Sequence, residues 1–184
     1  MVKFKNIEIV DIDYYFPKKE IDLKKKYSKI KSWNIEKTIA KTGFKKVFHS
    51  AHNETALDLS LIASKKLLKK NKINKEIIDC VIFVTQSPDY ILPTTACIVQ
   101  DKLKLKKNIL AFDINLGCSG FVKSLSVASS LINSNIVSNI LIICADTYTK
   151  YIFKNDKINL PLFSDCASVC YIKKGGKQKI GPFE

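Results

Sequence analysis

The chain has 184 residues, 46% of them hydrophobic, which suits one compact domain or half of a larger two-part fold. Its formal net charge is +14 and all 31 basic residues are lysine, so the arginine fork that reads bases and phosphates in nucleic-acid-binding proteins is missing. No apolar run reaches the ~18 residues of a membrane span and the N-terminus does not resemble a signal peptide, so we expect a cytoplasmic protein that binds neither nucleic acid nor a membrane.

Hydrophobic periodicity divides most of the chain into alternating strands and helices. Strands are expected at residues 5–16, 79–84, 109–112, 140–145 and 164–172. Helices are expected at residues 22–30, 33–40, 55–70 and 93–104, with a further one after the turn at 116–120. A turn at 41–44, a polar loop through His49 and His52, and residues 148–160 are expected to join these elements. Such alternation indicates an α/β layer with a mixed, mostly parallel sheet.

The stretch 109–131 organises the rest of the chain. Its apolar start, 109–112, suits a strand buried on both faces, and a helix rich in small residues, typical of an internal helix, follows the turn. Gly117 and Gly120 allow close backbone approach on both sides of one thiol. Cys118 is therefore expected at a strand-to-helix elbow, where free N–H groups and the helix dipole favour a thiolate. The other interpretation is a small buried residue that caps the helix.

The six cysteines do not predict a metal site. They include no C-x-x-C pair, and both histidines lie far from them in sequence, so zinc is not expected. Cys80, Cys144 and Cys170 fall in or beside apolar strands, which indicates inert buried thiols, and no disulfide is expected in the cytosol.

The lysines are spread along the chain, which is typical of a solvated surface. A patch that docks an acidic protein or a phosphate-bearing cofactor is the alternative.

Six motifs in order resemble the N-terminal half of the β-ketoacyl-acyl-carrier-protein synthase III family, within the thiolase-like superfamily. They cover most of residues 35–172, and the elbow is the most specific of them. The motifs are Lys41-Thr42-Gly43-Phe44, DCVIFVTQSPDY, LPTTACIVQ, AFDINLGCSGF, ILIICAD and LFSDCAS.

The resemblance implies a thiolase fold, of which residues 1–184 would form the N-terminal half, with the helix after the elbow internal. It implies an acyltransferase of fatty-acid or related acyl-chain biosynthesis, with Cys118 as the catalytic nucleophile and no bound cofactor. In that chemistry acyl-coenzyme A acylates the cysteine, and decarboxylation of a malonyl-carrier-protein yields the carbanion that forms the β-ketoacyl thioester. The Cys118 backbone N–H is placed to stabilise an oxyanion.

Two further positions match the family. Leu92 matches a residue that crosses the interface of a homodimer and shapes the partner's acyl pocket; the alternative is a simple loop-to-helix contact. Lys41 matches a basic position, usually arginine, near the coenzyme A entrance; the alternative is a solvated lysine.

The chain also departs from the family pattern. The family's catalytic histidine and asparagine lie in a second half, so we expect this chain to be a fragment that is inactive alone and exposes an apolar face. His49 and His52 match no catalytic position and are expected in a surface loop. Lys37 stands where the family has an adenine-stacking tryptophan, and a glycine-rich motif reads Phe163-Ser164-Asp165-Cys166-Ala167. A non-catalytic thiolase-like module that docks acyl carrier protein or a partner chain is the alternative function.

Overall fold

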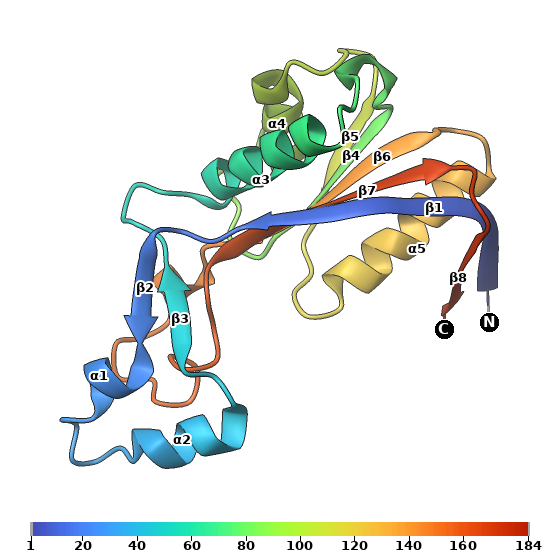
Figure 1. Cartoon of the computed structure of the whole chain (residues 1–184). Coiled ribbons are helices and arrows are strands. Elements are labelled where there is room, and N and C mark those ends of the chain that lie inside the picture. The colour runs from blue at the N-terminus through green and yellow to red at the C-terminus, as the bar shows by residue number, and fades with distance from the viewer. Residues whose placement is uncertain (1, 184) are drawn as a thin grey trace.

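The computed structural model describes residues 2–183 and has three layers. A six-stranded sheet in the order β5-β4-β6-β7-β1-β8 forms the middle layer. Helices α3 (Ala56–Lys70) and α4 (Thr95–Leu103) cover one face, and α5 (Gly120–Asn133) covers the other (Figure 1). This arrangement confirms the predicted layered α/β architecture.

The sheet combines parallel and antiparallel pairs. The strands are β1 (Val2–Tyr15), β4 (Cys80–Val84), β5 (Leu110–Ile114), β6 (Asn139–Asp146), β7 (Cys166–Lys174) and β8 (Gln178–Phe183). Strand β4 pairs parallel with β5 and β6, whereas the β6–β7, β7–β1 and β1–β8 pairs are antiparallel. Because β1 thus runs in the same direction as β4, β5 and β6, the sheet is mixed and mostly parallel, as predicted.

The continuous apolar sequence of β4 reflects burial on both faces. Val81 and Phe83 belong to the core beneath α3 and α4, while Cys80 and Ile82 belong to the core beneath α5. All four side chains are fully buried. Successive side chains on a strand point to opposite faces, so a strand between two helical layers needs apolar residues at every position.

Strand β5 differs from this expectation. It lies at the edge of the sheet and pairs with β4 alone. Leu110 is 40% exposed, and the rest of the strand is only partly buried. The prediction that residues 109–112 are buried on both faces was therefore wrong, because hydrophobicity does not distinguish a central strand from an edge strand.

A small separate lobe holds two strands that the sequence did not reveal. Strands β2 (Lys19–Asp22) and β3 (Lys46–His49) form an antiparallel pair, beside the short helices α1 (Leu23–Tyr27) and α2 (Ile35–Thr42) (Figure 1). Each strand has four residues, too few for a clear period-2 pattern among lysines. Gly43 ends α2 in the left-handed region, with φ of 78°, which confirms the predicted turn.

Other elements also differ from the predictions. Helix α4 begins at Thr95, two residues after Pro93, and β8 is an additional strand that the sequence did not predict. Short 3-10 helices occur at η1 (Lys75–Ile77) and η2 (Tyr148–Tyr151). Within residues 2–183, every helix is too short or too polar to cross a lipid bilayer.

Candidate active site

Cys118 lies on the turn between the end of β5 and the start of α5, as predicted from the sequence. Its side chain is exposed, and Ser119 is the N-cap residue of the helix. No side chain caps this helix and no acidic residue lies in its first turn. The free N–H groups and the positive end of the dipole therefore remain available to a negative charge near Cys118.

The glycines on either side of Cys118 bring the elbow against β4. A Cβ atom on Gly120 would overlap Cγ1 of Val84, and one on Gly117 would overlap the side chain of Gln86. Val84 is buried in β4 and β-branched, so it has little freedom to move. The close approach that the sequence predicted is therefore a contact between the elbow and the carboxyl end of β4.

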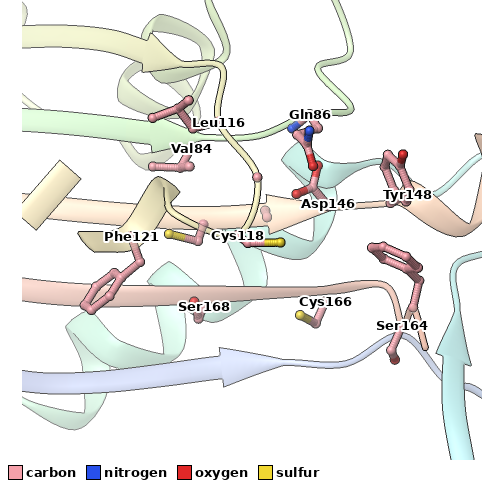
Figure 2. A pocket seen from close by; sticks show the side chains of 14 residues that line it. Val84, Gln86, Leu116, Cys118, Phe121, Asp146, Tyr148, Ser164, Cys166 and Ser168 are labelled. Atoms are coloured by element: carbon pink, nitrogen blue, oxygen red, sulfur yellow. The ribbon is translucent and has the colours of Figure 1, made fainter. Parts of the chain in front are cut away.

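Cys118 opens onto a pocket of about 260 Å³. Figure 2 shows Cys118 on the loop that leads into α5, between Asp146 of β6 and Cys166 of β7. The walls come from the carboxyl ends of β4 and β6, from the segment between β5 and the first turn of α5, and from the start of β7 with the residues before it. The pocket is lined by Val84, Gln86, Leu116, Gly117, Cys118, Phe121, Cys144, Ala145, Asp146, Tyr148, Phe163, Ser164, Cys166 and Ser168.

Asp146 holds the loop after β4 in place. Its Oδ1 accepts hydrogen bonds from the Gln86 backbone N–H at 2.7 Å, from the Ser87 hydroxyl at 2.8 Å and from the Thr85 hydroxyl at 3.0 Å. The Ser87 hydroxyl oxygen in turn accepts from the Thr147 N–H at 2.9 Å. One carboxylate thus fixes the backbone that supports Gln86 and, through Gln86, the elbow at Gly117.

Asp165 fixes the opposite rim. This fully buried carboxylate accepts hydrogen bonds from the backbone N–H and hydroxyl of Ser50 and from the same two groups of Thr149, at 2.7–2.9 Å. It therefore joins the end of β3 to η2, next to the pocket residues Ser164 and Cys166. Sequence reasoning noted Asp165 only as part of a motif, because its partners lie more than 100 residues away or in an irregular loop.

The six thiols occupy different environments. Cys80 and Cys170 are buried, and burial raises the pKa of each to about 12, which agrees with the prediction of inert thiols. Cys144 lines the pocket, but burial raises its pKa to about 12 as well. Burial also raises the pKa of Cys166, with a further contribution from the Asp146 and Asp165 carboxylates. Cys118 is the exposed thiol among those that line this pocket.

Lys41 and Leu92 do not join Cys118. Lys41 lies on α2 in a second pocket of about 440 Å³, which Lys37 and Lys157 also line. Leu162 lines this second pocket, whereas the next residue in the sequence, Phe163, lines the Cys118 pocket. The two pockets therefore have separate linings that include adjacent residues. Leu92 is 79% exposed on the loop before α4, away from both linings. Sequence reasoning did not single out Lys157, which lies in a segment expected to be plain loop.

The histidines are not both in a surface loop. His49 ends β3 and is half-buried, and burial is the main cause that lowers its pKa. His52 is exposed in the loop that follows. Neither histidine lines the Cys118 pocket, and residues 2–183 contain no group of three or more His, Cys, Asp or Glu side chains that could hold a metal ion.

Comparison with known proteins finds similarity by family model, by sequence and by structure. The sequence-family model of 3-oxoacyl-(acyl-carrier-protein) synthase III matches residues 112–184. The chain is 36% identical over 174 residues to beta-ketoacyl-(acyl-carrier-protein) synthase III of a Sulfurovum species, covering 92% of this chain and 50% of the relative. It is 37% identical to the enzyme of the same name from Clostridium perfringens, covering 89% of this chain and 49% of the relative.

Solved structures agree with the sequence relationship. A crystal structure of a 3-oxoacyl-(acyl-carrier-protein) synthase III matches with a TM-score of 0.89 at 36% identity, over 94% of this chain and 51% of that one. The corresponding synthase of Burkholderia xenovorans matches with a TM-score of 0.91 at 28% identity, over 97% of this chain and 51% of that one. In sequence and fold the chain is therefore similar to β-ketoacyl-acyl-carrier-protein synthase III enzymes, with a thiolase-like fold, and it spans about half the length of the curated relatives it matches.

Proposed function

We propose that Cys118 is the nucleophile of an acyl-transferring condensing enzyme of fatty-acid or related acyl-chain biosynthesis. The observation that carries the proposal is the position of one exposed thiol at an uncapped helix N-terminus, facing a pocket with apolar and polar walls. The Cys118 thiolate would attack the carbonyl carbon of an acyl thioester and expel the donor thiol, leaving the acyl group on sulfur. A backbone N–H at the elbow would bind the oxyanion that forms during the attack.

The second half-reaction needs groups from outside residues 2–183. A malonyl thioester must lose carbon dioxide, and its carbanion must then attack the acyl–Cys118 carbonyl to form a β-ketoacyl thioester. No histidine lines the Cys118 pocket in the described part of the chain, so the stabilisation of that carbanion must come from elsewhere. We infer that the described residues form the N-terminal half of a two-part thiolase fold and that the second half supplies these groups.

We infer that the donor is an acyl-coenzyme A that enters past Lys41. The pocket on α2 is lined by Lys37, Lys41 and Lys157 together with Ile158 and Leu162, and the Lys157 ammonium donates hydrogen bonds to Ser32. Lysines suit the phosphates of coenzyme A as point charges. The linings of the two pockets include neighbouring residues in the sequence, Leu162 and Phe163, so a donor bound at Lys41 would have to pass this segment to reach the thiol.

Acyl carrier protein and a second copy of the chain are the proposed partners. Acyl carrier protein would deliver the malonyl group, and the net charge of +14 favours an acidic partner. Within the described residues, edge strand β5 leaves one side without a strand partner. Ile91 and Leu92, on the loop before α4, are 91% and 79% exposed. Open strand edges and apolar loops are features that association covers. Six free cysteines agree with a reducing, cytoplasmic location.

Acyl labelling tests the proposal directly. The protein that carries this chain is incubated with radiolabelled acetyl-, propionyl- and longer acyl-coenzyme A, and labelled peptides are sequenced by mass spectrometry. We expect label on Cys118, loss of label in Cys118→Ser, and unchanged label in Cys97→Ser, which removes another exposed thiol. No label on Cys118 with any donor would refute the proposal. Carrier-protein binding that persists in Cys118→Ala without acyl transfer would instead support a non-catalytic docking module.

A further inference from the structure

Three of the six thiols line a single pocket, and acyl transfer at Cys118 uses only one of them. Cys118, Cys144 and Cys166 come from the elbow, β6 and β7 respectively. Cys144 and Cys166 lie on neighbouring strands, because Cys144 pairs with Ser168 and Asp146 pairs with Cys166 in the β6–β7 register. The pocket thus brings an exposed thiol close to two that are partly buried.

Cys166 is the better placed of the two to react with Cys118. Cys166 is the first residue of β7 and follows an irregular segment, whereas Cys144 lies inside β6 with ladder partners on both β4 and β7. Figure 2 shows the Cys166 side chain on the wall below the Cys118 loop. Cys118 lies in the turn before α5, outside the sheet ladder, and within residues 2–183 Cys166 has a ladder partner on β6 alone, so both have fewer backbone partners than Cys144 and more freedom to move than it has. A disulfide needs that freedom, because its two Cα atoms must approach within about 7 Å.

We propose that Cys118 and Cys166 form a reversible redox pair that closes to a disulfide in response to a hydroperoxide. The Cys118 thiolate attacks the distal peroxide oxygen, the O–O bond breaks, and hydroxide leaves and takes up a proton, which gives water and a sulfenic acid. The Cys166 thiol then loses its proton and attacks that sulfur, so that an S–S bond forms and a second water leaves. Two thiols and one hydrogen peroxide become one disulfide and two waters.

Cys118 and Cys166 have different environments and therefore different roles in this reaction. Cys118 is exposed and meets the oxidant first, whereas Cys166 is partly buried and is held mainly as the thiol. A largely protonated resolving thiol reacts slowly, although its thiolate is intrinsically the stronger nucleophile. The disulfide would occupy the sulfur that acyl transfer requires, and a dithiol would restore it. The pair would thus protect Cys118 from irreversible oxidation beyond the sulfenic acid.

Peptide mapping tests the proposal on the chain as it stands. The reduced protein is treated with hydrogen peroxide, blocked with iodoacetamide and digested with trypsin without reduction. Cleavage after lysine places Cys118 in peptide 108–123, Cys144 in 124–150, and Cys166 together with Cys170 in 158–173. We expect a linked pair of 108–123 with 158–173 whose fragment ions assign the bond to Cys166, and full release by dithiothreitol.

Matched variants decide among the possible outcomes. Cys166→Ser should lower the yield of the linked pair at least about tenfold and increase sulfinic acid on Cys118, whereas Cys97→Ser should change neither. Folding of each variant is checked by circular dichroism. A bond from Cys118 to Cys144, or sulfinic acid on Cys118 with no linked pair in the wild type, would overturn the proposal. Acyl labelling of reduced Cys118 is measured separately, so failure of the redox pair is distinguishable from failure of the proposed acyl transfer.

Discussion

The parallel and antiparallel parts of the sheet hold their carboxylates in different ways. At the ends of β5 and β6, Asp113 and Asp146 accept hydrogen bonds from backbone N–H groups: Asp113 caps α4 at 2.7 and 2.8 Å, and Asp146 binds the Gln86 N–H. In the antiparallel part, Asp11 and Asp13 of β1 pair with lysine side chains of α3, at 2.8 and 2.6 Å, and the backbone N–H that each binds is that of the next residue in the same strand. Hydrogen bonds to backbone N–H groups of a loop fix the geometry of that loop. Ion pairs with long lysine side chains hold a helix against the sheet but restrict its exact position less.

This contrast explains where the Cys118 pocket lies. The carboxyl ends of the parallel strands β4, β5 and β6 meet at one edge of the sheet, and the loops that follow them supply Gln86, Cys118 and Tyr148. Ligand sites in open α/β sheets form outside the carboxyl ends of their strands. The antiparallel strands β1 and β8 contribute no residue to the pocket lining within the described chain. They extend the core, and β1 carries the ion pairs of Asp11 and Asp13 with α3.

The largest expected effect is a difference in thiol reactivity between the pocket rim and the sheet interior. In the native state Cys97 and Cys118 should react rapidly with iodoacetamide, because both are exposed. Cys80 and Cys170, whose pKa values are raised to about 12 by burial, should react about a thousandfold more slowly than an ordinary thiol of pKa about 8.5. Timed alkylation with peptide mapping measures this, with protein in urea as the control. Fast labelling of Cys170 in the native state would contradict the assigned core.

The next effect concerns the contact between the elbow and β4. Gly120→Val should lower the free energy of unfolding by about 1–3 kcal/mol or more, because the new side chain must displace Val84 or the start of α5. Urea denaturation measures the loss. Ser130→Ala, an exposed change on the same helix, should stay within about 0.5 kcal/mol of wild type. Equal stabilities of the two variants would show that the elbow does not press on β4.

Asp146 tests whether backbone-bound carboxylates support the site. Asp146→Ala leaves the Gln86 N–H and two buried hydroxyls without their acceptor, which should cost about 1–3 kcal/mol in urea unfolding. It should also change the rate of Cys118 alkylation, because the loop that supports the elbow is released. Asp156→Ala is the matched control, since Asp156 accepts hydrogen bonds from Ile158 and Asn159 in a partly exposed turn that does not line the Cys118 pocket. An altered Cys118 rate in that control, or an unaltered one in Asp146→Ala, would count against the supporting role.

Sequence patterns predicted those features that depend on local periodicity. The apolar run at residues 79–84 and the glycines beside Cys118 have a physical reason visible in the sequence itself, and β4 and the elbow occur where predicted. The edge position of β5 could not be predicted, because it depends on which strand becomes a neighbour. The same holds for Asp165, whose partners Ser50 and Thr149 come from distant segments, and for Cys166, which only the folded chain places opposite Cys118.

The smallest expected effect is the pH dependence of the ion pairs on β1. Hydrogen bonds from Asn71 and Lys70 lower the pKa of Asp11 to about 2, against an ordinary value of about 3.9. The folded state thus prefers the ionised carboxylate, and this stabilisation is present above about pH 4 and is lost as the pH falls towards 2. Asp11→Asn should therefore be less stable than wild type near neutral pH and approach it at pH 2. Urea midpoints across that range, with the exposed Asp101→Asn as control, measure the difference. A difference in urea midpoint between wild type and Asp11→Asn that stays constant down to pH 2 would mean that Asp11 contributes to stability through packing and not through its charge. The contrast between the two parts of the sheet would then lose its electrostatic basis.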